Sequence, residues 1–166
     1  MLRRFCFLLP AAALVLVIIT GCDSERPLIP NGRHAPAFEL EHLNGGRVRL
    51  SDLRGQVVAI RFWADWCRFC KKEMRDLEPE YQRLAPQGLR MLAINVEQKR
   101  ARVARTIEDI GISYDTLLDS DGAVSRDYGV IALPVTFLVD RKGVVRGKII
   151  GESDPVTFSQ MVEPLL

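Results

Sequence analysis

The sequence predicts an α/β fold in which a mixed central sheet is flanked by helices on both faces. Residues 56–64 are almost continuously apolar and rich in β-branched and aromatic side chains, and residues 88–96 are similarly apolar. Both patterns are typical of strands covered on both faces. Helical segments alternate with such strands, and a hairpin followed by a helix ends the chain. With 166 residues, 48% of them hydrophobic and 27% charged, the chain suits one globular domain.

The first half of the domain begins with a hairpin. Residues 37–43 and 47–53 alternate between apolar and polar side chains on either side of Asn44-Gly45-Gly46, a typical hairpin turn. The strand 56–64 follows, and then a helix that starts at Cys67. Pro79 falls inside this helix and predicts a kink or a restart. One helix face carries the apolar residues Met74, Leu77, Tyr81 and Leu84.

The second half alternates strands and helices. The predicted elements are a strand over 88–96, a helix over 99–111, a short strand over 113–119, a short helix over 122–130, a hairpin over 135–150 and a helix over 154–166. Asp154 is the expected N-cap of the last helix, with Pro155 in its first position. The helix 99–111 carries four basic residues: Lys99, Arg100, Arg102 and Arg105. They indicate a solvated helix face rather than a docking face for an acidic partner.

The N-terminal segment predicts export and lipidation. Arg3 and Arg4 precede an apolar run that is short for a membrane-spanning helix. The following "ITGC" resembles the lipobox of bacterial lipoproteins, which implies a signal peptide over 1–21 and a lipid on Cys22. Residues 22–35 are then a lipidated cysteine and polar tether, and 36–166 the domain. Asp23 is typical of lipoproteins kept in the inner membrane. An ordinary signal peptide or a short anchor helix is the alternative.

The cysteine count then leaves one pair. Of four cysteines, Cys6 leaves with the signal peptide and Cys22 carries the lipid, so Cys67 and Cys70 can pair only with each other or with a partner. Outside the cytoplasm a disulfide between them could persist. Without residues 1–21, which include two of the 23 basic residues and no acid, 21 basic residues balance 21 acidic ones. This balance gives no support for nucleic-acid binding.

The position of the pair favours redox chemistry. Strand 56–64 gives way to a helix at Cys67, where unpaired amides and the helix dipole stabilise a thiolate. The cations of Arg68, Lys71 and Lys72 add to this effect and should lower the pKa of Cys67. Cys70 lies one turn further on and can attack a mixed disulfide formed at Cys67.

A cysteine pair has three other common uses. A structural zinc site needs four ligands, and the only histidines, His34 and His42, lie well upstream. A purely structural disulfide would constrain the unfolded chain little, because the loop is short. Two thiolates could bind Cu(I), so a copper carrier remains open.

Two motifs resemble the TlpA/ResA-like extracytoplasmic thioredoxins. "FWADWCRFC", including Trp66, is similar to the thioredoxin active-site run, and "LPVTFLVD" is similar to the loop with the cis-proline, here Pro134. The resemblance implies a thioredoxin fold with an extra N-terminal β-hairpin. It also implies that Pro134 turns the backbone of Leu133 toward an extended substrate, which could pair with it as an added strand.

The family resemblance implies a function and partners. The protein should be an extracytoplasmic thiol-disulfide oxidoreductase that reduces protein disulfides for cytochrome c maturation or copper-site assembly. Its only redox group would be the Cys67–Cys70 disulfide, with no metal or other cofactor. A membrane thiol donor would supply electrons to a monomer held on the cell membrane by its lipid, facing the periplasm or another extracytoplasmic space.

Two departures from the family pattern lie at the cysteines and beneath them. Phe69 stands where the family usually has proline. The two residues between the cysteines tune the reduction potential, so the resemblance does not predict its value. Arg61 occupies the strand position of thioredoxin's buried acid. Glu73 matches an acid that ResA-like proteins place near their cysteines. Arg61 either pairs with Glu73 beneath the disulfide or reaches solvent at the strand end.

Two enzyme and carrier alternatives fit the sequence less well. Peroxiredoxins need a threonine three residues before the reactive cysteine and a proline four residues before that, and Ala64 and Ile60 stand there. A copper chaperone of the Sco type would have a CxxxC spacing and a downstream histidine, and neither is present.

Overall fold

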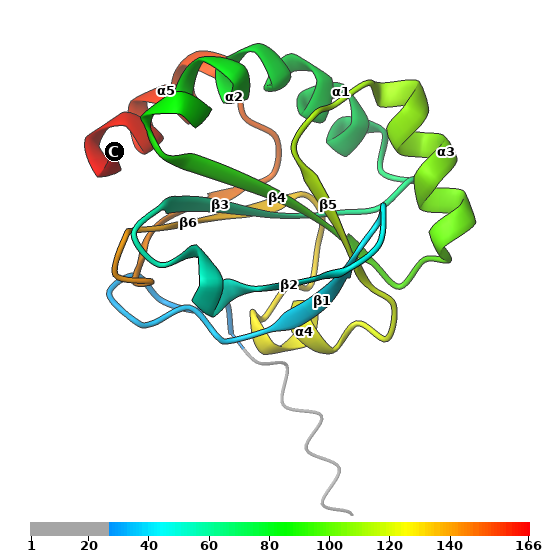
Figure 1. Cartoon of the computed structure of the whole chain (residues 1–166), viewed down its shortest axis with the longest axis horizontal. Helices are drawn as coiled ribbons and strands as arrows, with labels where there is room; N and C mark the ends of the chain where they lie inside the picture. The colour runs from blue at the N-terminus through cyan, green and yellow to red at the C-terminus, as the bar shows by residue number, and fades with distance from the viewer. Residues whose placement is uncertain (1–26) are drawn as a thin grey trace, which may run out of the picture.

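The computed structural model describes residues 27–166, which form a seven-stranded sheet in the order β2-β1-β5-β4-β3-β6-β7 (Figure 1). The predicted signal peptide, Cys22 and the first part of the predicted tether lie outside the described residues. The strands are β1 (Glu39–His42), β2 (Arg47–Arg49), β3 (Val57–Trp63), β4 (Leu89–Val96), β5 (Asp115–Asp119), β6 (Val135–Val139) and β7 (Val145–Ile150).

The fully buried strand β3 lies inside the sheet, between β4 and β6. It pairs in parallel with β4 and antiparallel with β6, which makes the sheet mixed, as predicted. All seven residues of β3 are buried, because both faces of the sheet are covered. The N-terminal hairpin joins the sheet where β1 pairs antiparallel with β5.

Helices cover both faces of the sheet, as predicted. In Figure 1, α1, α2, α3 and α5 lie on one side of the sheet, and α4 lies on the other. The helices are α1 (Arg68–Asp76), α2 (Glu78–Leu84), α3 (Arg100–Ile110), α4 (Ala123–Asp127) and α5 (Pro155–Val162), with 3-10 turns η1 (Leu50–Leu53), η2 (Ala85–Gln87) and η3 (Glu163–Leu165). Within residues 27–166, none of these helices is long and apolar enough to cross a membrane.

The break between α1 and α2 confirms the predicted restart near Pro79. Leu77 ends α1, and Pro79 occupies one of the first two positions of α2, where its missing N–H costs no helical hydrogen bond. Leu77 and Leu84 are both buried against the sheet, so the apolar stripe continues across the break.

The described part of the predicted tether differs from a free spacer. Leu28 and Ile29 pack against the core cluster that contains Tyr128. The amide of Ile29 donates to the Tyr128 carbonyl, and His34 forms a β-bridge with Val144. Apolar side chains and backbone pairing therefore hold residues 27–35 against the domain, which the polar composition of this segment did not suggest.

Candidate active site

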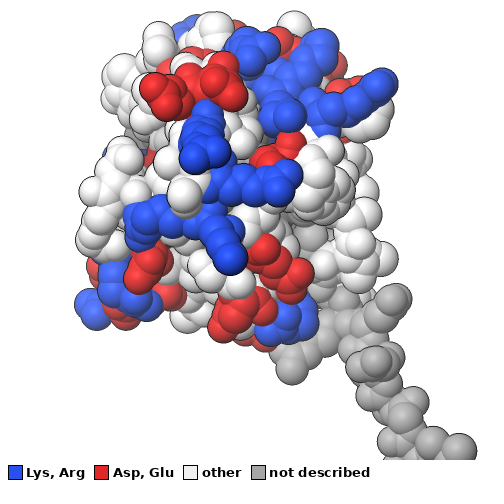
Figure 2. Space-filling view, turned by 90° about the vertical axis from the view of Figure 1, so that its right-hand side faces the viewer, with Lys and Arg blue, Asp and Glu red and all other residues white. Residues whose placement is uncertain are grey.

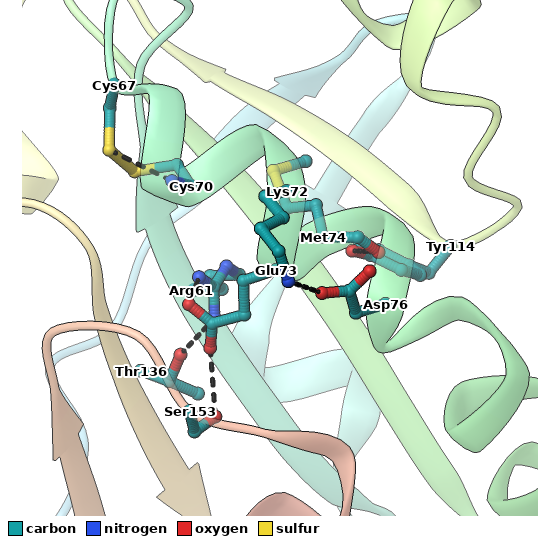
Figure 3. Close-up of polar contacts among 10 residues, drawn as sticks. All are labelled: Arg61, Cys67, Cys70, Lys72, Glu73, Met74, Asp76, Tyr114, Thr136 and Ser153. Atoms are coloured by element: carbon teal, nitrogen blue, oxygen red, sulfur yellow. Dashed lines mark hydrogen bonds and ion pairs between the residues drawn. A yellow bond between two sulfur atoms is a disulfide. The ribbon is translucent and has the colours of Figure 1, made fainter.

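The cysteine pair lies where β3 gives way to α1. Cys67 is the N-cap of α1, and the structure joins its sulfur to that of Cys70 in a disulfide (Figure 3). The amide of Cys70 lies 3.2 Å from Cys67 Sγ and donates to it. The sulfur of Cys67 thus occupies the positive end of the helix, as predicted.

The two cysteines differ in their access to solvent. Cys67 is 6% exposed and Cys70 is fully buried, whereas neighbouring Trp66 is 70% exposed. An incoming reagent therefore meets Cys67 first, while Cys70 is held behind it in the core. This asymmetry is what an attacking and a resolving cysteine require.

The loop before β6 lies at the same end of the sheet as the disulfide. Phe62 of β3 is the register partner of Val135, so Pro134 stands beside the strand end that leads to Cys67. The Leu133–Pro134 peptide bond is cis, as predicted. Leu133 is half-buried and packs against the core cluster that contains both cysteines.

Beneath the disulfide, Arg61 and Glu73 form a buried ion pair (Figure 3). Both guanidinium Nη atoms donate to the Glu73 carboxylate, one of them across 2.7 Å to Oε1. Two hydroxyls complete the cluster: Thr136 accepts from Arg61 at 3.1 Å, and Ser153 donates to Glu73 at 2.9 Å. Of the two alternatives for Arg61, the pair with Glu73 is therefore present, and the one in which Arg61 reaches solvent is wrong. A bidentate pair of this kind compensates both buried charges, and of the Arg61 guanidinium only Nε has no hydrogen-bond partner in the described part of the chain.

A second polar cluster supports the loop between β3 and α1. Asp65 is buried and accepts hydrogen bonds from Gln98 and from the guanidinium of Arg102 on α3. Gln98 Oε1 in turn accepts from the Asp65 amide and from Asn95, each at 2.8 Å. Burial raises the pKa of Asp65, but these donors outweigh burial and hold it below its usual value. The cluster fixes the backbone next to Trp66.

Neither Asp65 nor Ser153 was singled out from the sequence. Asp65 did carry a signal, since it is an acid between apolar residues immediately before the cysteine motif. Ser153 carried none, because it comes from the loop before α5, 80 residues after Glu73. That loop is held by Asp154, the predicted N-cap, which accepts from the amides of Val156 and Thr157 at 2.9 Å each.

The chain is similar to known proteins over almost its whole length. The sequence model of the AhpC/TSA family covers residues 31–148. The chain belongs to this family. It is 35% identical over 167 residues to the thiol-disulfide oxidoreductase ResA of Geobacillus thermodenitrificans, a match that spans 99% of this chain and 94% of that protein. With ResA of Bacillus subtilis (strain 168) the identity is 34%, over 98% and 93% of the two chains.

A solved structure agrees with these relatives. The DsbE-type thiol:disulfide interchange protein of Chlorobium tepidum superposes with a TM-score of 0.78 at 28% identity, covering 82% of this chain and 98% of that one. The chain is thus a thiol-disulfide oxidoreductase of the ResA-like group with a thioredoxin fold. None of the three relatives is named a copper chaperone or a peroxidase.

Proposed function

We propose that this ResA-like chain reduces disulfides of proteins outside the cytoplasm, with Cys67 as the attacking and Cys70 as the resolving cysteine. The observation that carries the proposal is the asymmetric pair: Cys67 caps α1 and keeps a small exposed fraction, and Cys70 is fully buried one turn behind it. The disulfide is the only redox group the reaction needs.

The reaction balances with these two residues alone. The Cys67 thiolate, stabilised by the helix N-terminus, attacks one sulfur of the substrate disulfide. The substrate S–S bond breaks, a mixed disulfide forms, and the first substrate thiolate leaves. Cys70 then loses its proton and attacks Cys67 Sγ, which releases the second substrate thiolate. Two electrons pass from the dithiol to the substrate, whose two thiolates take up two protons.

The cis-proline loop supplies a docking place for the substrate. Pro134 and Leu133 lie beside the end of β3 that leads to Cys67. An extended substrate segment can pair there with the Leu133 backbone as an added strand. Apocytochromes c and copper-site proteins are the substrate classes that the resemblance to ResA-like thioredoxins suggests, and a membrane thiol donor would return Cys67 and Cys70 to the dithiol.

Lipidation of Cys22 would hold the monomeric protein on the membrane, facing the extracytoplasmic side. The supporting feature is Gly21-Cys22 after a short apolar run. Mass spectrometry of the membrane-bound protein should find a diacylglyceryl group on Cys22. Cys22→Ser should remain unprocessed, and an unmodified Cys22 in a membrane-free protein would refute the anchor.

The redox proposal is tested by turnover of a protein disulfide. Insulin with dithiothreitol as donor should be reduced by the wild-type protein faster than by dithiothreitol alone. Cys67→Ser should lose this acceleration. Cys70→Ser should react once and then stall as a mixed disulfide. If the wild-type protein gives no acceleration but binds one Cu(I) tightly, the same two thiolates serve metal carriage instead.

A further inference from the structure

Three basic side chains of α1, the helix that Cys67 caps, have no ion pair among residues 27–166. Arg68 and Lys71 have no acidic partner among residues 27–166, and Arg75 donates only to the backbone carbonyls of Asp109 and Ile110. Spaced by three and four residues, Arg68, Lys71 and Arg75 follow one side of α1, which we call the α1 cationic stripe. Figure 2 shows basic side chains gathered on the face that carries α3, which packs beside α1.

Three of the acidic residues around α1 are already paired with cations outside this stripe. Glu73 is bound by Arg61, Asp65 by Arg102, and Asp76 by Lys72. Arg68 and Lys71 therefore keep charge that no carboxylate of residues 27–166 pairs with, within one helical turn of Cys67.

Exposed apolar side chains accompany the charge. Trp66 is 70% exposed, Phe69 48% and Ile131, in the loop before Pro134, 75%. The guanidinium of Arg68 lies 4.7 Å from the centre of the Phe69 ring, so charge and apolar surface are adjacent. Aromatic residues beside arginine are typical of surfaces that bind proteins.

We infer that the α1 cationic stripe selects substrates whose cysteine is followed or preceded by acidic residues in an extended segment. Arg68 and Arg75 are seven residues apart on a helix, or about 10 Å. An extended chain covers that distance with about three residues. In this arrangement the attacked cysteine of the substrate would lie at Cys67. Apolar residues beside it would pack against Trp66 and Phe69, and acidic side chains of the substrate would lie along the stripe. This inference rests on the proposed reductase function.

An anionic membrane surface fits the observations less well than a peptide. The stripe begins at the residue after Cys67, so a membrane bound there would cover the disulfide and exclude protein substrates. An acidic peptide uses the same charges while it delivers its own cysteine to Cys67.

The test compares three peptides that carry the same intramolecular disulfide, flanked within three residues by two Glu, two Gln or two Lys. Reduced full-length protein reacts with each in a single turnover, and peptide thiols are counted by mass spectrometry. At low ionic strength the Glu peptide should react about fivefold faster than the Gln peptide, since two exposed ion pairs contribute modestly. At about 0.5 M salt the ratio should approach one.

Charge reversal identifies the residues responsible. Arg68→Glu combined with Lys71→Glu should bring the ratio of Glu to Gln peptide rates below one. This ratio is insensitive to any change in Cys67 reactivity, because both peptides meet the same thiolate. Lys142→Glu is the matched control: Lys142 is exposed in the β6–β7 turn, at the opposite end of β3 from Cys67, and should leave the ratio unchanged.

The failures are distinguishable. If all three peptides react at equal rates, the inference is wrong and the reductase function stands. If the Gln peptide is not reduced at all, the proposed function fails and the inference with it. If the double variant loses binding to phosphatidylglycerol vesicles while the peptide ratio stays at one, the stripe serves a membrane and the inference is likewise wrong.

Discussion

A fully buried arginine is costly unless its charge is compensated, and Arg61 is compensated by a single carboxylate, that of Glu73. The guanidinium Nε has no partner in the described part of the chain, so the two bonds to Glu73 and the one to Thr136 satisfy the group only in part. Loss of the carboxylate would leave a buried charge directly beneath the disulfide.

Replacing Glu73 by Gln should therefore destabilise the oxidised protein strongly. Breaking a buried ion pair by removing one partner costs about 3–5 kcal/mol, because the remaining charge stays buried. Urea unfolding measures the loss. Lys72→Gln, which breaks the exposed pair with Asp76 on the same helix, is the control and should change the midpoint little. A Glu73→Gln midpoint equal to that of the control would contradict a functional ion pair.

Asp65→Asn should destabilise the protein in a pH-dependent way. The pKa of Asp65 is lowered in the folded state, so its carboxylate stabilises the fold above the unfolded pKa of about 3.9. The stabilisation is lost as the pH falls through the lower folded pKa. At pH 7 the variant should lose about 1–2 kcal/mol through weaker hydrogen bonds to Gln98 and Arg102.

Urea midpoints of wild type and Asp65→Asn, measured at pH 7, 5 and 3, check this pattern. The gap between the two proteins should be equal at pH 7 and 5 and smaller at pH 3. A gap that is as large at pH 3 as at pH 7 would mean that the charge of Asp65 does not matter.

At the level of elements, helix termini build the site. The N-terminus of α1 holds Cys67, and the N-terminus of α5 holds Ser153 against Glu73. The backbone N–H groups of Thr157 and Val156 and the hydroxyl of Thr157 lower the pKa of Asp154, so this cap is a carboxylate at neutral pH. Because Ser153 directly precedes this cap, the start of the last helix is joined to the buried ion pair through the Ser153 hydroxyl.

Asp154→Ala should lower Tm by a few degrees, because α5 loses the acceptor for two of its free amides. Asp154→Ser should retain most of the stability, since serine is also a good N-cap. Differential scanning calorimetry of both variants makes the comparison. Equal melting temperatures for the alanine and serine variants would show that the side chain does not act as a cap.

The sequence predicted these elements better than their contacts. Short-range signals were enough for Cys67 at a helix start, for the restart at Pro79 and for the N-cap Asp154. The Arg61–Glu73 pair was one of two alternatives, because an arginine in an apolar strand needs either an acid within reach or access to solvent at the strand end. Ser153 and Thr136 could not be foreseen, since β6 and the loop before α5 reach this pair only through long-range sheet pairing.

At the scale of the whole molecule, the sheet order brings the functional parts to one end. The position of β3 between β4 and β6 puts the cysteine loop beside Pro134. The apolar pattern predicted that β3 and β4 are buried but not their order, because many orders bury the same strands. The apolar pattern likewise did not predict that Leu28 and Ile29 pack against the core cluster that contains Tyr128.

Trapping the substrate at Cys67 in cells tests this function most directly. The full-length Cys70→Ser protein keeps the attacking thiol but lacks the resolving one, so its mixed disulfides should accumulate. Mass spectrometry should find extracytoplasmic proteins joined through Cys67, and the Cys67→Ser protein, expressed equally, should hold none. If the Cys70→Ser protein captures no more partner than the Cys67→Ser protein, Cys67 does not attack protein disulfides and the reductase function is wrong.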